Sequence, residues 1–315
     1  MGIFLWGLQA ARAETPAMDI ALAKSLNHLM VLALHQYKEV SDLPAPQVTW
    51  TKDGKQALSL LEKGDVQTAV VGLGPLATLE NASFSPRILA SLSSVNNLYH
   101  VLTLKGSRIQ TPADLRGKTI AVSLNSTMHV ALIDLLTGLR IEPDQVKLVT
   151  PSNNDALLEM LRSGEVDAVC TRDPYLTTIQ ETLKEKVQLL GGTGSMGNTF
   201  HLVTTQANVQ KNAPFLKNLL QALLAAEAFL RNKPSEAIPL LATLMEKSQE
   251  QIKIELANSR SYVRLDSSLI LKLEAMHRWH QRHSPAHDAT YTSFHPLLAP
   301  DLLRSVRPDR VDSLL

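Results

Sequence analysis

Cysteine is almost absent from this 315-residue sequence, which has a single copy, Cys170, inside the apolar run VDAVCT. One cysteine excludes an internal disulfide and any metal site that is built from several cysteines. Because its neighbours are apolar, we expect a buried and inert thiol rather than a catalytic nucleophile. No cysteine lies near the start of the chain, so a lipid anchor is not expected.

The sequence also lacks an excess of one charge, since 31 basic and 30 acidic residues leave a formal net charge of +1. A general nucleic-acid binder needs a clustered basic excess that displaces counterions, so no nucleic-acid partner is expected. Hydrophobic residues make up 44% of the chain and charged residues 19%, which is typical of a folded globular protein. At this length we expect two domains, each with its own core.

Long hydrophobic runs are missing, and no stretch approaches the 18 or so apolar residues that span a bilayer. The opening residues, MGIFLWGLQAARAETPAMD, place a short apolar segment before Ala11-Arg12-Ala13, which fits signal-peptidase cleavage. We therefore expect a short signal peptide at 1–13 and a soluble periplasmic protein. The usual positive opening segment is absent, so either the true start lies upstream or this is an ordinary N-terminus.

Motifs for catalysis are absent as well. The sequence contains no Gly-x-Ser-x-Gly elbow and no phosphate-binding loop, so no catalytic residue and no cofactor are expected. His277, His280 and His283 recur at three-residue spacing, with His287 and His295 beyond. A metal site is one interpretation of that spacing, but such runs are more often solvated helix ends, and we predict no metal.

What the sequence does contain is a helix–strand motif that occurs twice, called the repeated device below. QALSLLEKGDVQTAVVGLGPL (56–76) and ALLEMLRSGEVDAVCTRDPYL (156–176) each run from a helical pattern through Gly-acid-Val into a short strand and a proline. Gly64 and Gly164 are predicted to take the left-handed conformation that ends a helix. The repeat indicates one helix–strand unit in each of two α/β lobes, unless two such units look alike by chance.

Strands and helices alternate along the chain up to about Ala213, and the pattern is helical from there on. Alternation predicts an α/β fold with parallel sheets covered on both faces. We expect one lobe from 14–104 plus 203–315, with C-terminal helices, and a second lobe from 105–202. Open α/β sheets bind ligands at the carboxyl ends of their strands, so two such lobes would face one another across a cleft.

Four short motifs follow one another in the second half of the repeat region. They are DLRGK (114–118), NSTMH (125–129), PDQV (143–146) and GEVDA (164–168). This ordered set resembles the nitrate/sulfonate/taurine class of ABC-transporter substrate-binding proteins. The resemblance implies a two-lobed periplasmic-binding-protein fold of type II, with a hinge of two crossing strands, near Leu102–Gly106 and Asn198–Val203.

The same resemblance points to the turn at 125–129 as a ligand site. Asn125, Ser126 and Thr127 precede a helix whose free backbone N–H groups attract anions, and His129 completes the motif. The alternative is ordinary helix capping, which needs no ligand. Asn125 stands where the family usually has glycine, and Arg172 stands where a bulky residue is common. The identity of the ligand therefore cannot be copied from a relative.

Other candidate ligand residues follow three different strands. Arg172 is suited to clamping a sulfonate or carboxylate at two points, or alternatively to an internal pair with Asp173 or another acid of the cleft. Gly72 and Gly74 permit close approach of the backbone to a ligand, or simply form a tight turn. In the loop after the first strand, the candidates for hydrogen bonds to the ligand are Ser25 and Asn27.

These features favour an exported, monomeric receptor that captures a small anionic solute by hinge closure and delivers it to the membrane permease of an ABC importer. One alternative is a protein that binds the pyrimidine precursor of thiamine, or a biosynthetic enzyme of that pathway on the same fold. The cysteine-rich iron motif of those enzymes is missing here. A cytosolic sensor domain is a third hypothesis, but the chain lacks room for a fused DNA-binding motif before the first lobe.

Overall fold

The strands of the protein form two separate sheets. This computed structural model describes residues 18–23, 27–79, 84–96, 98–124, 126–153, 155–173, 175–192, 198–283 and 293–315. The expected signal peptide, Ser25 and Asn125 lie outside these ranges. No helix within them is both long and apolar enough to span a bilayer.

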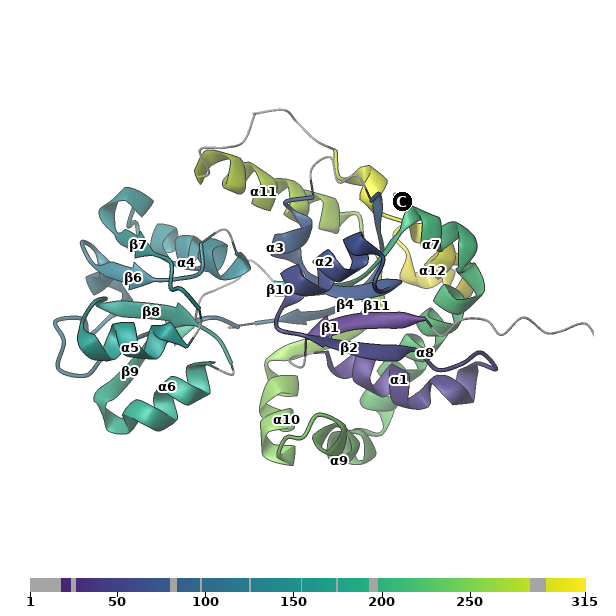
Figure 1. Ribbon diagram of the computed structural model, residues 1–315, viewed down its shortest axis with the longest axis horizontal. Coiled ribbons are helices and arrows are strands. Elements are labelled where there is room, and N and C mark those ends of the chain that lie inside the picture. Colours follow the sequence, from purple (N-terminus) through teal and green to yellow (C-terminus); the bar gives the residue numbers. More distant parts are fainter. Residues whose placement is uncertain are drawn as a thin grey trace, which may run out of the picture.

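The first lobe is built on a six-stranded sheet with the order β11-β4-β10-β3-β1-β2. Its strands are β1 (Asp19–Ala23), β2 (Gln47–Thr51), β3 (Thr68–Gly72), β4 (Pro86–Val95), β10 (Asn198–Thr205) and β11 (Ser259–Arg264). Its helices are α1 (His28–Val40), α2 (Gly54–Lys63), α3 (Leu73–Leu76), α7 (Gln206–Lys211), α8 (Ala213–Asn232), α9 (Pro234–Leu244), α10 (Gln249–Ala257), α11 (Ser268–His283) and α12 (Pro300–Val306). Figure 1 shows these helices on both faces of the sheet.

The second lobe is smaller and is built on a five-stranded sheet with the order β7-β6-β8-β5-β9. Its strands are β5 (His100–Leu104), β6 (Thr119–Ala121), β7 (Lys147–Val149), β8 (Ala168–Thr171) and β9 (Val187–Gly192). Its helices are α4 (Thr127–Gly138), α5 (Ala156–Ser163) and α6 (Tyr175–Leu183). One hydrophobic cluster packs α4 on the sheet and another packs α5 and α6 on it, so both faces are covered, as predicted.

The repeated device occupies the same place in both lobes. α2, Gly64 and β3 match α5, Gly164 and β8, and the two glycines have φ values of 79° and 76°. In each lobe the parallel strands have equivalent orders, β2-β1-β3 and β7-β6-β8, and an antiparallel strand follows the third. The repeat therefore reflects two similar halves, and the α/β fold class is confirmed.

Three expectations about the sheets need correction. The sheets are mixed rather than parallel, because β4, β10 and β11 run antiparallel to their partners, as do β5 and β9. β11 was missed inside the helical C-terminal region, where its alternation of polar and apolar residues covers only the six residues SRSYVR. β9 was missed because its sequence, VQLLGG, ends in two glycines that favour a turn.

The expected lobe boundaries are displaced from the observed crossings. β5 lies wholly in the second sheet and β10 wholly in the first, although the boundaries were expected after 104 and after 202. The chain crosses between Val95 and His100 and again between Gly192 and Asn198. We therefore propose that the hinge does not lie within β5 or β10, because ladder hydrogen bonds hold each of these strands in one sheet.

The antiparallel pair beside the crossings contains a buried histidine. His201 of β10 is fully buried, with Nδ1 at 2.9 Å from Ser91 Oγ and Nε2 at 2.8 Å from Thr199 Oγ1. Burial, aided by the charge of Lys272, lowers the pKa of His201 to about 3. The imidazole is therefore neutral at physiological pH and links two strands.

This histidine predicts a pH dependence of stability. An unfolded histidine has a pKa of about 6.5, so the unfolded chain binds more protons than the folded chain as the pH falls below that value. The free energy of unfolding should drop by about 1.4 kcal/mol per pH unit from this residue alone, until the pH nears the folded pKa. In His201→Gln the slope measured by urea denaturation should be shallower by that amount. An equal slope in both proteins would contradict the prediction.

Cys170 lies in the middle of β8 and is fully buried, as predicted. Burial also raises the pKa of its thiol, which keeps it protonated. We expect the native protein to resist a thiol reagent such as dithionitrobenzoate and the urea-unfolded protein to react with one equivalent. Rapid reaction of the native protein would show that β8 opens far more readily than its packing indicates.

Candidate functional site

A cavity of about 950 Å³ lies between the two lobes and is lined by residues of both. The first lobe contributes the loop from β2 to α2, the start of α3, the first residues of β10 and the segment joining α9 to α10. The second lobe contributes the turn before α4 and the start of α6, and the crossing adds Leu98 and Tyr99. This cavity, called the cleft below, therefore forms where parallel strands of both lobes end.

Three helices begin at the walls of the cleft, and each has a side-chain cap. Asp53 Oδ1 accepts a hydrogen bond of 2.9 Å from the backbone of α2, and Asp173 Oδ1 accepts one of 3.2 Å from the backbone of α6. Ser126 Oγ accepts a bond of 3.3 Å from His129 N in α4 and donates one of 2.6 Å to Ser123 O. Ser126 therefore caps α4, which is the alternative that the sequence left open. Ser126 also lines the cleft, so ligand binding by this residue stays a prediction.

The two lobes touch at the junction of α3 and α4, which we call the seam (Gly74 and Thr127). The amide of Gly74 donates a hydrogen bond of 3.1 Å to Thr127 Oγ1. A Cβ atom at Gly74 would lie 2.1 Å from that oxygen and 2.9 Å from the Thr127 amide nitrogen. Gly74 therefore serves close approach of the other lobe, whereas Gly72 lines the cleft itself.

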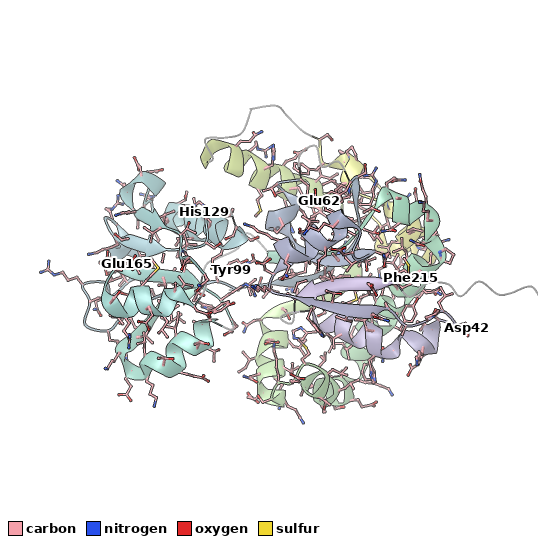
Figure 2. The ribbon with its side chains drawn as sticks, in the orientation of Figure 1. Asp42, Glu62, Tyr99, His129, Glu165 and Phe215 are labelled. Carbon is pink, nitrogen blue, oxygen red and sulfur yellow. The ribbon has the colours of Figure 1, made fainter. Side chains whose placement is uncertain are left out.

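Tyr99 stands where the chain enters the second lobe and lines the cleft close to the seam (Figure 2). Burial raises the pKa of Tyr99 to about 12, against the opposing effects of the Arg172 charge and a hydrogen bond with Thr127. The phenol is therefore neutral and is hydrogen-bonded to Thr127 of the seam. The sequence reasoning missed Tyr99, because an aromatic residue before a strand looks like any core residue.

Arg172 and Asp173 both line the cleft. Arg172 Nη1 donates to the backbone oxygen of Asp173 at 3.3 Å. The Asp173 carboxylate instead accepts hydrogen bonds from the backbone and hydroxyl of Thr177. The carboxylate therefore serves the start of α6, and the guanidinium lies half-buried at the cleft wall.

The wall formed by the α9–α10 segment was not predicted as part of the site. Glu255 accepts bonds of 2.6 Å from Lys247 Nζ and 2.8 Å from His28 Nε2. Burial alone would raise the pKa of Glu255, but these two hydrogen bonds and the Lys247 charge hold it below its ordinary value. Lys247 and Glu255 both line the cleft. Because their opposite charges are paired, this part of the cleft surface carries little net charge.

Besides Gly74, two predicted residues lie outside the cleft lining. Asn27 is buried at the start of α1, where Nδ2 donates a bond of 2.6 Å to Ala23 O and closes the end of β1. His129 is buried in α4 (Figure 2). The Asn27 side chain therefore holds the end of β1 rather than forming the surface of the cleft.

Of the histidine run, the structure describes the side chains of His277 and His295, whereas those of His280, His283 and His287 lie outside the described residues. His277 is buried, with Nδ1 at 3.2 Å from Ala77 O and its ring edge-on to Phe294 at 5.4 Å. No group of three or more potential metal ligands occurs among the residues that the structure describes. The solvated helix end that was the favoured alternative is wrong for His277, which packs in the core of the first lobe.

Two curated proteins of Escherichia coli (strain K12) resemble the chain. The "Putative aliphatic sulfonates-binding protein" is 26% identical over 242 residues, which cover 75% of this chain and 74% of that protein. The "Taurine-binding periplasmic protein" is 29% identical over 136 residues, 42% of each chain. Both are named as binding proteins rather than enzymes.

A solved structure extends the likeness to the whole fold. The alkanesulfonate-binding protein SsuA of Xanthomonas axonopodis pv. citri, bound to MOPS, superimposes with a TM-score of 0.72 at 20% identity. The match covers 91% of this chain and 99% of that one. At this identity it shows the shared fold, which is the two-lobed periplasmic-binding-protein fold that the motifs implied.

One family model matches residues 47–237, which is more than half of the chain. The matched span includes the repeated device, the seam and Arg172, and it runs through both lobes. Together with the relatives, this match confirms the resemblance found in the four motifs. The chain belongs to the NMT1/THI5-like family.

Proposed function

We propose that the protein is the extracytoplasmic solute-binding component of an ABC importer and that it captures a small organic anion between its lobes. The observation that carries this proposal is the cleft, onto which Arg172 and the starts of α2, α4 and α6 all open. Helix N-termini and a guanidinium both attract anionic groups. Among the cleft acids, Asp53, Asp173 and Glu255 are engaged by hydrogen bonds from the protein itself.

The size and the lining of the cleft favour an organic anion over an inorganic one. A volume near 950 Å³ equals that of about 30 water molecules in the liquid, far more than nitrate or bicarbonate fills. Side chains such as Phe200, Met245 and Ile254 give the cleft apolar surface, and Ile254 is 54% exposed. A sulfonate with a carbon body matches this combination best, in agreement with what the relatives are named for.

Several features support binding without chemical conversion. Cys170, the sole thiol, is buried in β8 and absent from the cleft lining, so it is not available as a nucleophile. Two lobes can close on a solute by hinge bending without converting it chemically, so the two-lobed architecture is sufficient for this function. We further infer a periplasmic location, which the name of the taurine-binding relative supports, and propose a monomer that passes its solute to a membrane permease.

A thermal-shift screen tests this proposal. The panel should hold alkanesulfonates, taurine, nitrate, bicarbonate and the pyrimidine precursors of thiamine, because the last would favour the alternative function. A solute present at a hundredfold its dissociation constant should stabilise the protein by about 2.7 kcal/mol. We expect sulfonates to raise the melting temperature and nitrate to leave it unchanged. Stabilisation by the pyrimidines alone would contradict the proposal.

A further inference from the structure

The lining of the cleft includes a buried amide whose oxygen lacks a hydrogen-bond partner among the described residues. Asn198 is the first residue of β10, where the chain returns to the first lobe, and it lines the cleft. The residue is 4% exposed, and among the described residues nothing hydrogen-bonds to its Oδ1. Buried polar atoms in proteins nearly always have a partner, so this oxygen needs an explanation.

The polar neighbours of Asn198 do have partners. Thr199, the next residue, is buried to the same degree and lines the cleft, and its hydroxyl is bonded to His201. Ser126 on the opposite wall is bonded to Ser123 and His129. Among the described residues that line the cleft, only Asn198 has a buried side-chain polar atom without a partner. An unpartnered buried group of this kind lowers the stability of the folded protein.

We propose that Asn198 is a ligand-binding residue whose side-chain oxygen accepts a hydrogen bond from an N–H or O–H group of the solute. This inference rests on the proposed function and narrows it, since the solute must then carry a donor group apart from its anionic group. Asn198 belongs to the first lobe and Arg172 to the second. A solute that contacts both spans the cleft, so its binding favours the closed arrangement.

The donor requirement defines a solute class. An anion at Arg172 with a hydroxyl, amine or amide elsewhere on its carbon body satisfies both residues, whereas a plain alkanesulfonate satisfies only one. A site that is built to hydrogen-bond a donor discriminates strongly against the analogue that lacks it, because its polar atom stays unpaired. Asn198 is therefore a residue that determines specificity as well as affinity.

The test is a cycle of two solutes and two proteins. Calorimetric titration compares 2-hydroxyethanesulfonate with ethanesulfonate, which have the same charge and differ by one hydroxyl, in the wild type and in Asn198→Leu. We expect the wild type to prefer the hydroxylated solute about tenfold, which corresponds to one good hydrogen bond. Asn198→Leu should bind both solutes alike and should be at least as stable as the wild type without solute. Asn198→Ala is measured in parallel in case leucine does not fit.

A matched control separates the solute contact from the mere removal of a buried polar atom. Thr68 in β3 is fully buried, its Oγ1 also lacks a partner among the described residues, and it lies outside the cleft lining. Thr68→Val should keep the wild-type preference between the two solutes. If the Asn198 variants keep it too, or lose both solutes equally, the inference is wrong. If neither sulfonate binds the wild type, the proposed function fails and this inference fails with it.

Discussion

Gly74→Ala is expected to weaken solute binding at least tenfold while leaving the fold of each lobe intact. The added methyl would lie 2.1 Å from Thr127 Oγ1 and 2.9 Å from its amide nitrogen. The hydroxyl can rotate away, but the backbone amide cannot, so the lobes must separate at the seam. A closed state that is disfavoured by about 1.4 kcal/mol lowers the apparent affinity about tenfold. Calorimetric titration with the sulfonate that binds best measures the effect.

A second glycine provides the control for the seam. Gly138 ends α4, the same helix that begins at Thr127, and a Cβ there would meet no atom within 4 Å. Gly138→Ala should bind the solute as the wild type does, with stability equal or slightly higher. Equal affinities for Gly74→Ala and Gly138→Ala would mean that the seam plays no part in closure, and the hinge account would need revision.

Arg172→Ala is expected to weaken an anionic solute at least tenfold. The guanidinium lies half-buried at the cleft wall, where a charge-assisted hydrogen bond contributes about 1.5–3 kcal/mol. Arg172→Lys should fall between alanine and the wild type, because it keeps the charge and loses the two-point geometry. Titration at low and at moderate salt should show the smallest salt dependence for the alanine variant.

The control for Arg172 comes from the outer surface of the same lobe. Arg162 of α5 forms an exposed pair with Glu159, 2.8 Å apart, and does not line the cleft. Arg162→Ala removes the same charge from the protein and should change neither the affinity nor, to within about 0.5 kcal/mol, the stability. If Arg172→Ala matches this control, Arg172 does not bind the solute.

Local sequence signals predicted the parts of the fold that local physics decides. Gly64 and Gly164 end their helices in the left-handed conformation as predicted, because glycine takes it at little cost. The structure shows a further local feature of this kind in the short helix at Pro112–Leu115, where Thr111 and Asp114 form a capping box. These features depend only on residues within one turn of each other, so the sequence itself reveals them.

The site was predicted less completely, because much of it depends on contacts between distant parts of the chain. His28 and Glu255 are 227 residues apart in sequence and 2.8 Å apart in space. The α9–α10 wall was absent from the predicted site for the same reason. One signal was available for Asn198, since a polar residue opens the apolar strand FHLVTT at the expected crossing, but its lack of a partner appears only in three dimensions.

The most direct test of the account compares an anion with its neutral isostere in one titration experiment. Ethanesulfonate and ethanesulfonamide have nearly the same shape and differ in the charge that Arg172 and the helix N-termini are proposed to recognise. We expect the sulfonate to bind the wild-type protein with one site per chain and at least tenfold tighter than the sulfonamide. Equal affinity for the two, or binding of the sulfonamide alone, would contradict a cleft that captures organic anions.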